Sequence, residues 1–201
     1  MEKKKRCGWC EGDDLYELYH DREWGVPVYD DENIFEFLVL ETFQAGLSWI
    51  TILRKRENFR RAFDDFDYRK IAGYSEDKIQ ELLGDAGIIR NKLKVRATVS
   101  NAAAFMKVQE EFGSFSKYIW GFVNHEPKQN QVVNYKEAPP TTPTSDRLSK
   151  DLKKRGFKFV GSTVIYAHMQ ATGMVNDHEI SCFRYDEVQS LQGIKPGKGN
   201  R

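Results

Sequence analysis

Apolar residues recur at the helical period along most of this chain, and this periodicity restricts the possible folds more than any other property. Ile34, Phe37 and Leu38, followed by Glu41, stand at i, i+3, i+4 and i+7, which predicts a helix with one apolar face. The same spacing predicts further helices near 50–63, 79–83, 93–105, 146–155 and 162–172. Alternating strand patterns with Asn-Gly or Asp-Gly turns are missing. We therefore predict an all-α fold.

The length of the chain and its breaks suggest a single helical domain. Its 201 residues, 40% of them apolar, suffice for one sizeable core. We expect this domain to span residues 1–190 and residues 191–201 to form a flexible tail. The polar segment 124–144 contains four prolines and reads as a long surface loop. Thr144 or Ser145 is the expected N-cap of the helix that follows, and Gly156 its expected end.

The charge of the chain is balanced in total but uneven along its length. A net charge of +1 argues against a protein that binds nucleic acid by bulk charge. However, residues 11–36 hold ten acidic side chains against the single Arg22, a local charge of −9, so the rest of the chain carries +10. The excess gathers at 54–61, 90–96 and 147–158. These stretches are either solvated helix faces or basic segments that converge on a phosphate backbone.

The expected location follows from three further observations. No apolar run reaches the roughly 18 residues of a membrane span, so no membrane partner is expected. The basic N-terminus is followed by a polar segment instead of the apolar stretch of a secretory signal. Three cysteines are too few for a disulfide scaffold. We therefore expect a cytoplasmic protein.

Cysteine and histidine are scarce, yet five of them form two groups near opposite ends of the chain. Cys7 and Cys10 form C-x2-C with His20 ten residues on, while His178 and Cys182 form H-x3-C, whose side chains would share one face of a helical turn. Five candidates for the four positions of a tetrahedral zinc ion predict a structural site that joins the two ends. A redox pair at the C-x2-C, or ordinary buried side chains, are the alternatives.

A second group combines aromatic side chains with one carboxylate. Tyr16 and Tyr19 lie at i, i+3, Trp9 stands between the first two cysteines, and Glu41 ends an apolar helix face shortly before Trp49. Burying a carboxylate is costly unless it is paired or functional, and aromatic faces attract cations. These residues therefore form either a pocket for a flat cation or part of the core.

The two helices predicted within 146–172 form a candidate helix-hairpin-helix. Backbone N–H groups at such a turn and at the start of the second helix can hold a phosphate without reading its base. Lys153, Lys154 and Lys158 would add affinity that does not depend on the base sequence and weakens with salt.

Seven motifs, in register from Cys7 to about Cys182, together resemble the DNA-3-methyladenine glycosylase I family. The motifs are Cys7-Gly8-Trp9, Tyr19-His20-Asp21 with Glu23-Trp24-Gly25, Gln44-Ala45-Gly46-Leu47-Ser48-Trp49, Asp85-Ala86-Gly87-Ile88-Ile89-Arg90, Phe122-Val123-Asn124-His125, Lys154-Arg155-Gly156-Phe157-Lys158-Phe159-Val160-Gly161 and Val175-Asn176-Asp177-His178. The resemblance implies an α-helical fold of the helix-hairpin-helix glycosylase superfamily with an added zinc site.

Carried over residue by residue, the resemblance assigns a role to each group. It implies one structural Zn²⁺ per chain, with Cys10 outside the ligand set. It implies that Glu41 recognises the base and is the catalytic residue. The implied zinc ligands are Cys7, His20, His178 and Cys182; the implied base pocket adds Trp9, Tyr16, Tyr19 and Trp49; and the implied DNA contacts are Gln44, Gly46, Leu47, Lys158, Gly161, Ser162 and Thr163. Residues 44–47 would fill the gap that the extruded base leaves in the duplex.

The implied activity is that of a monofunctional, monomeric DNA glycosylase. It would flip 3-methyladenine out of alkylated double-stranded DNA, hydrolyse the glycosidic bond and release the free base. Methylation at N3 makes the base cationic and weakens its bond, so recognition matters more than a strong acid. Asn176 stands where superfamily relatives carry a catalytic Asp, with Asp177 shifted by one, and Ser162 and Thr163 stand where a lyase lysine is expected. We therefore assign no general base and expect no lyase activity.

Two other functions remain open on the residues alone. One is a zinc-stapled module that binds DNA without catalysis, and it has no use for a carboxylate behind aromatic rings. The other is a thiol oxidoreductase that uses Cys7 and Cys10.

Overall fold

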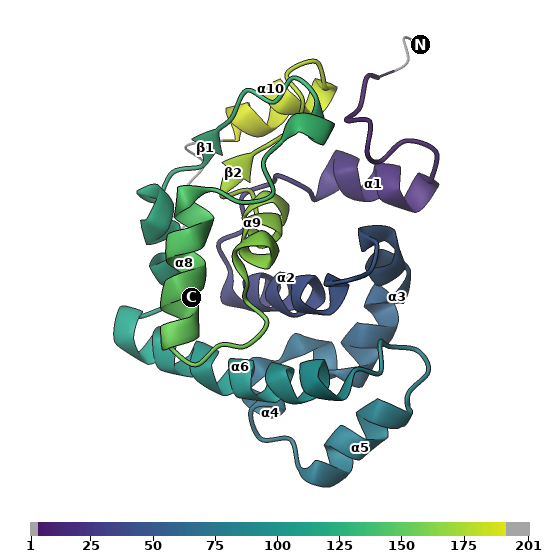
Figure 1. Ribbon diagram of the computed structural model, residues 1–201, viewed down its shortest axis with the longest axis vertical. Helices are drawn as coiled ribbons and strands as arrows, with labels where there is room; N and C mark the ends of the chain where they lie inside the picture. Colours follow the sequence, from purple (N-terminus) through teal and green to yellow (C-terminus); the bar gives the residue numbers. More distant parts are fainter. Residues whose placement is uncertain (1–3, 192–201) are drawn as a thin grey trace, which may run out of the picture.

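A central helix, α2 (Asp31–Gln44), organises the computed structural model, which describes residues 4–191. Figure 1 shows α3, α6 and α9 around it, and α2 contacts these three helices as well as α7. The other elements in chain order are α1 (Asp14–Arg22), α3 (Trp49–Ala62), η1 (Asp64–Phe66), α4 (Tyr68–Ile71), α5 (Glu76–Gly84), α6 (Lys92–Phe112), α7 (Phe115–Trp120), η2 (Gly121–Val123), β1 (Lys128–Gln129), η3 (Tyr135–Glu137), α8 (Pro143–Lys154), α9 (Ser162–Ala171), β2 (Val175–Asn176) and α10 (Phe183–Ser190). The predicted all-α class is confirmed as a predominantly helical architecture.

Helix α2 is buried on every side, whereas its periodicity predicted a single apolar face. All residues from Ile34 to Phe43 are buried because neighbouring helices surround α2. Its N-cap is Asp30, which accepts a hydrogen bond from the Asn33 N–H at 2.9 Å. Full burial places two glutamates, Glu36 and Glu41, inside the protein, where each needs a compensating partner.

Helices α8 and α9 occupy the region of the predicted hairpin and pack against each other. Helix α8 starts earlier than expected, since its N-cap is Thr142, in a capping box with Ser145, and not Thr144 or Ser145. Its predicted end is confirmed: Gly156 follows the C-cap with a φ of +92°, a conformation that glycine adopts without strain.

Two sequence expectations were wrong about local structure. The segment 124–144 is not a continuous loop, because it contains β1 and η3, and β1 pairs in parallel with β2 through the register Lys128–Val175. His178 and Cys182 do not share a helical turn, since residues 177–182 form turns and a single bridge from Glu179 to Val132. Both features depend on pairing between distant segments, which periodicity does not detect.

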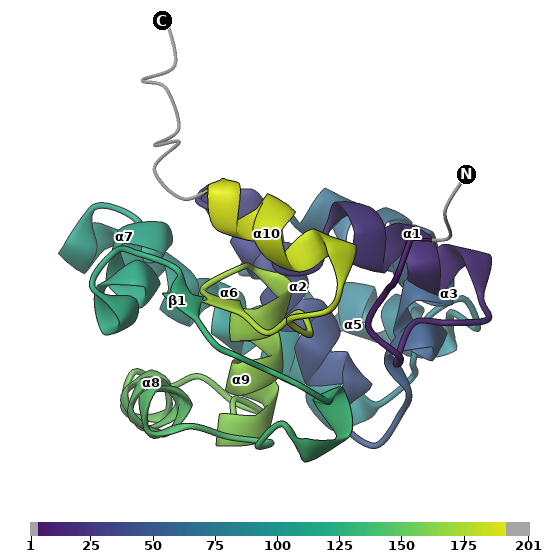
Figure 2. The same cartoon turned by 90° about the horizontal axis from the view of Figure 1, so that it is seen from above.

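The N- and C-terminal regions of the described chain meet on one side of the molecule. Figure 2 shows α1 and α10 on the same face, and the Phe183 N–H donates to the Lys5 carbonyl oxygen at 2.9 Å. Of the expected flexible tail, residues 192–201 lie outside the described residues. Within residues 4–191, no helix has both the length and the apolar character needed to cross a membrane.

Gly173 is the position where the fold least tolerates a side chain. It has a φ of +67°, and a Cβ there would lie 2.4 Å from the Val26 carbonyl carbon and 2.6 Å from the Gly25 carbonyl oxygen. We expect Gly173→Ala to lower the free energy of unfolding by about 3 kcal/mol, measured by urea denaturation. Gly113→Ala is the matched control, because Gly113 also has a positive φ, +86°, but nothing within 4 Å. Equal losses in the two variants would show that close packing at Gly173 contributes nothing.

Candidate active site and metal-binding group

A cavity of about 230 Å³ lies between the C-terminal half of α2, the N-terminal segment and α9. Its lining combines aromatic rings with a few polar groups, the composition typical of sites for small flat ligands. The lining residues are Trp9, Tyr16, Tyr19, Trp24, Glu41, Gln44, Trp49, Tyr135, Ala138, Ala167, Gln170 and Asp177. The structure thus brings together around one cavity all five residues of the base pocket that the resemblance implies.

Glu41 is a buried carboxyl group that has no charged partner within residues 4–191. It is 3% exposed, and its Oε2 has no hydrogen-bond partner among the described residues. Glu36, five residues earlier on α2, is neutralised by Arg56 and Arg60 at 2.5 and 2.8 Å. Because burial alone acts on Glu41, desolvation raises its pKa to about 8. A cationic ligand in the cavity would supply the missing partner.

The aromatic walls offer faces and unused polar atoms to such a ligand. The rings of Trp9 and Tyr16 meet edge to face, with centroids 4.8 Å apart, and those of Tyr19 and Trp49 lie 5.6 Å apart. The Tyr19 hydroxyl and the Trp49 Nε1 are buried without hydrogen-bond partners among the described residues. Desolvation raises the pKa of Tyr16 to about 12, so this phenol stays a neutral donor. Buried orphan polar atoms at one cavity point to a ligand that satisfies them.

Several lining residues were missed by sequence reasoning. Trp24 extends the aromatic wall, with its ring 5.0 Å from that of Trp9. Tyr135 reaches the cavity from η3, where its backbone N–H donates to Glu179 Oε1 at 3.0 Å. Trp24 belongs to a quoted motif and could have been included. Tyr135 carried no signal, because its position depends on how the segment 124–144 folds back.

Asn176 and Asp177 face different surroundings. Asn176 is buried away from the cavity and donates to Gln129 Oε1 and to the Tyr185 carbonyl oxygen. Asp177 lines the cavity and accepts hydrogen bonds from Tyr166, Gln170 and Asn130 at 2.6–2.7 Å. Its carboxylate is therefore held by three uncharged side chains, none of them a histidine.

An exposed turn follows the cavity helix. Gln44 closes the turn by donating to the Leu47 carbonyl oxygen at 3.2 Å, and Gly46 adopts a φ of +87°. Leu47 is 39% exposed, although transfer of an apolar side chain out of water is favourable. The turn therefore presents an apolar tip beside the cavity mouth.

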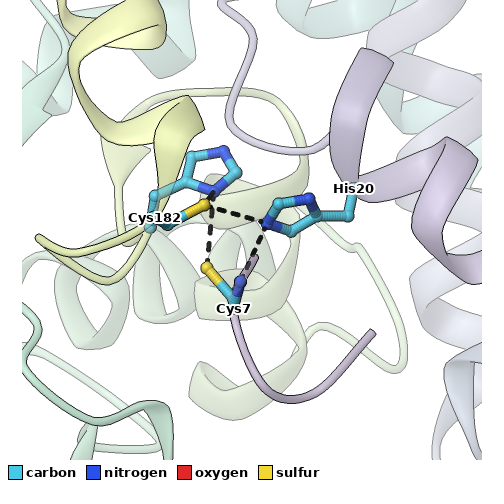
Figure 3. Close-up of side chains that lie close together, drawn as sticks. Cys7, His20 and Cys182 are labelled. Carbon is cyan, nitrogen blue, oxygen red and sulfur yellow. Dashed lines mark hydrogen bonds between the residues drawn. The ribbon is translucent and has the colours of Figure 1, made fainter. Parts of the chain in front are cut away.

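Four side chains from the two ends of the chain form a compact metal-binding group. The ligand atoms of Cys7, His20, His178 and Cys182 all lie within 4.8 Å of one another, and all four residues are buried. Figure 3 shows Cys7, His20 and Cys182 pointing toward a common centre. The Cys7 Sγ–His178 Nδ1 and Cys182 Sγ–His20 Nε2 distances are 3.5 and 3.4 Å. A tetrahedral zinc ion, with bonds of about 2.3 Å to sulfur and 2.0 Å to nitrogen, requires edges of about 3.5 Å.

The surroundings of this group prepare its atoms for a cation. The Nδ1 of His20 is 2.8 Å from Asp21 Oδ1, and the Nε2 of His178 is 3.0 Å from the Trp24 carbonyl oxygen. Each acceptor holds a proton on the outer nitrogen, so the inner nitrogen presents its lone pair. Cys10 lies outside the group, and its Sγ donates to the Cys7 carbonyl oxygen at 3.2 Å.

The turn between α8 and α9 exposes backbone donors next to lysines. Helix α9 begins after Gly161 with no side-chain cap, so the N–H groups of its first turn are free of capping side chains. A groove beside them is lined by Asp146, Ser149, Lys150, Lys153, Lys154 and Ser162. The basic stretch 54–61 behaves differently, because Arg56 and Arg60 bind Glu36 inside the protein. Only part of the basic excess is therefore available to a phosphate backbone.

Comparisons with known proteins agree with this geometry. The family model described as methyladenine glycosylase matches residues 9–185. The DNA-3-methyladenine glycosylase 1 of Escherichia coli is 50% identical over 181 residues, which cover 90% of this chain and 97% of that protein. A crystal structure of 3-methyladenine DNA glycosylase I superposes with a TM-score of 0.87 at 49% identity, covering 89% of this chain and 98% of the other.

A second solved structure concerns the recognition of 3-methyladenine. The 3-methyladenine DNA glycosylase I of Staphylococcus aureus, solved to explain 3-methyladenine recognition, superposes with a TM-score of 0.85 at 37% identity. The match covers 88% of this chain and 94% of that one. Since the family model spans most of the sequence and the relatives align over nearly their full length, this chain belongs to the methyladenine glycosylase family.

Proposed function

We propose that this chain is a DNA glycosylase that excises 3-methyladenine from alkylated double-stranded DNA in base excision repair. The observation that carries this proposal is Glu41, a buried carboxyl group at a cavity walled by aromatic rings, whose Oε2 has no partner among the residues that the structure describes. A base methylated at N3 carries the positive charge that this cavity lacks. Relatives with the same activity in their names are 46–50% identical to the chain.

The chemistry of excision follows from the charge of the base. The glycosidic bond of a cationic purine is already weakened, so the enzyme needs to extrude the base, hold it and exclude competing bases. Glu41 accepts a hydrogen bond from the exocyclic amine of the base, while Trp9, Tyr16, Tyr19 and Trp49 surround its ring. An unmethylated adenine is neutral and gains less from each of these contacts. Hydrolysis then releases free 3-methyladenine, without lyase chemistry.

The DNA contacts come from two exposed elements. Gln44, Gly46 and Leu47 enter the duplex at the position of the extruded base, which the exposed apolar tip of the turn supports. The α8–α9 hairpin binds the backbone, with Lys158, Gly161, Ser162 and Thr163 at its turn. Free N–H groups at the start of α9 support this role.

The metal-binding group holds one structural zinc ion. Cys7, His20, His178 and Cys182 supply two sulfur and two nitrogen ligands, the donor set that zinc prefers, and four protein ligands leave no open position for water. The ion joins the two ends of one domain spanning residues 1–190, and the enzyme acts as a monomer.

Base release tests the proposed function directly. The protein is incubated with duplex DNA treated with a methylating agent, and released bases are separated by liquid chromatography and identified by mass. We expect 3-methyladenine in the released fraction and no base release from untreated duplex. Salt-sensitive DNA binding without any released base would instead support the alternative, a non-catalytic zinc-stapled module.

Lys158 tests the backbone contact. Its side chain is exposed while its backbone is held by Asn101, so Lys158→Ala removes a charge without loosening the turn. We expect a several-fold loss of affinity for duplex of any sequence and a salt slope smaller by about one. Lys107→Ala, at an exposed lysine of α6 outside the proposed contacts, is the control. An unchanged slope would remove Lys158 from the DNA interface. The measurement is fluorescence anisotropy at several salt concentrations.

A further inference from the structure

The ammonium group of Lys94 is buried beneath the exposed turn that follows α2. Its Nζ donates to the Phe43 carbonyl oxygen at 3.0 Å and to the Ala45 carbonyl oxygen at 2.9 Å. Lys94 is 6% exposed, and none of the described carboxylates forms an ion pair with it. The sequence places it in the basic stretch 90–96, where a solvated side chain would be expected.

The position of Lys94 is unfavourable for a lysine in two ways. Desolvation lowers its pKa, so burial of the charge costs free energy. Lys94 also stands in the first turn of α6, where the helix dipole disfavours a cation. A residue that contradicts two local rules needs a compensating role, and such residues concentrate at functional sites.

Within residues 4–191, the carbonyl groups that Lys94 binds have no other donor. Helix α2 ends at Gln44 with Ala45 as its C-cap, and the closing backbone bond of the turn runs from the Leu47 N–H to the Gln44 carbonyl oxygen. No backbone N–H of the described residues is bonded to the Phe43 or Ala45 oxygen. Lys94 therefore holds the junction between the helix that carries Glu41 and the exposed turn.

Helix α6 makes a second, similar contact seven residues later. Asn101 is 2% exposed; its Nδ2 donates to the Lys158 carbonyl oxygen at 3.0 Å, and its Oδ1 accepts from the Lys158 N–H at 2.8 Å. Residues i and i+7 lie on the same helix face, about 10 Å apart along the axis. One face of α6 thus holds the backbone of the turn after α2 and the backbone of the α8–α9 turn.

We propose that Lys94 and Asn101 are positioning residues that set the spacing between these two DNA-facing turns. This inference rests on the proposed function, in which one turn enters the duplex and the other binds its backbone. Both polar side chains form hydrogen bonds with backbone atoms of a turn, so the spacing does not depend on the side chains of the turns. Fixed spacing couples backbone binding to extrusion of the base, while neither Lys94 nor Asn101 lines the pocket around Glu41.

Measurements with two substrates distinguish a positioning role of Lys94 and Asn101 from a general contribution to folding. Free 3-methyladenine enters the pocket without DNA, and its affinity is read from tryptophan fluorescence. Methylated duplex requires both turns, and its single-turnover rate of base release is measured. We expect Lys94→Met and Asn101→Leu each to lower the duplex rate about 30-fold and to leave the affinity for the free base within twofold. Lys94→Arg, which keeps the charge and the donors, recovers most of the rate.

Lys55→Met is the matched control. Lys55 also donates to two backbone carbonyl oxygens, those of Ala86 and Gly87 at 3.2 and 3.0 Å, but outside the two DNA-facing turns. We expect it to leave both readouts within twofold. Equal losses for the free base and the duplex, or an undiminished duplex rate, in variants that unfold cooperatively like the parent would overturn the inference. Failure of the parent protein to release any base would instead reject the proposed function.

Discussion

Replacing Glu41 with glutamine is expected to lower the single-turnover release of 3-methyladenine from methylated duplex by at least about 100-fold. The cationic base loses a carboxylate whose Oε2 has no hydrogen-bond partner among residues 4–191, and removing one partner of a buried charge pair costs roughly 2–5 kcal/mol. Glutamine is close to glutamate in size, so the cavity keeps its shape. Affinity for duplex without a methylated base should change little, because Glu41 lies inside the pocket and not on the DNA-facing turns.

The same substitution should remove a pH dependence. Only the ionised carboxylate attracts the cation, and the pKa of Glu41 is raised to about 8 by burial. We therefore expect kcat/KM of the parent to fall about tenfold per pH unit below pH 8 and to level off above it. A profile that keeps this shape in Glu41→Gln would assign the titration to another group.

Glu41 should also make the free energy of unfolding depend on pH, in the opposite direction to the dependence of kcat/KM. Because the pKa of folded Glu41 exceeds the ordinary value of 4.5, the folded state binds more protons than the unfolded state between pH 4.5 and 8. The free energy of unfolding of the free protein should therefore decrease as pH rises through this window, by at most about 1.4 kcal/mol per unit. Glu36→Gln is the control: it removes an ion-paired glutamate of the same helix and should leave this slope in place.

Local patterns were sufficient to predict elements whose residues interact nearby in the chain. The helix at 34–41 and the stop at Gly156 both follow from spacing and backbone preference, and the structure has both. The all-round burial of α2 was not predictable from its own residues, because it results from the helices that happen to surround it. Periodicity predicts which face of a helix is apolar, whereas the packing of neighbouring helices determines how many of its faces are buried.

Some residues of the candidate site could be predicted from the sequence, and others depend on tertiary contacts. Glu41 could be selected because it ends an apolar helix face, and Tyr19 and Trp49 because they belong to motifs of the family that the chain resembles. Tyr135 could not, since it reaches the cavity only through the pairing of β1 with β2. Lys94 lies in a basic stretch that was interpreted as either a solvated helix face or a phosphate-binding segment, because a sequence does not show which ammonium group is buried against backbone carbonyls.

Removing the proposed zinc ion should produce the largest change in stability. The four ligands come from both ends of the chain, so without an ion two cysteines and two histidines crowd one buried space and no covalent link joins α1 to α10. We expect chelation, or Cys182→Ser, to lower the free energy of unfolding by more than about 5 kcal/mol, because structural zinc ions contribute roughly 10 kcal/mol or more to small domains. In a thermal scan this corresponds to a midpoint lower by at least about 10 °C.

The pocket should fail together with the metal site, while backbone binding should persist. Trp9 and Tyr19 flank the ligands Cys7 and His20, so loosening these ligands displaces two walls of the cavity, whereas the α8–α9 turn is held by Asn101 on α6. Metal content by mass spectrometry distinguishes the ligand set: Cys10→Ser should retain one zinc ion per chain and Cys182→Ser should lose it. An equal loss of zinc in both variants would place Cys10 among the ligands. An unchanged thermal midpoint after complete chelation would show that the contacts between the chain ends suffice without the ion.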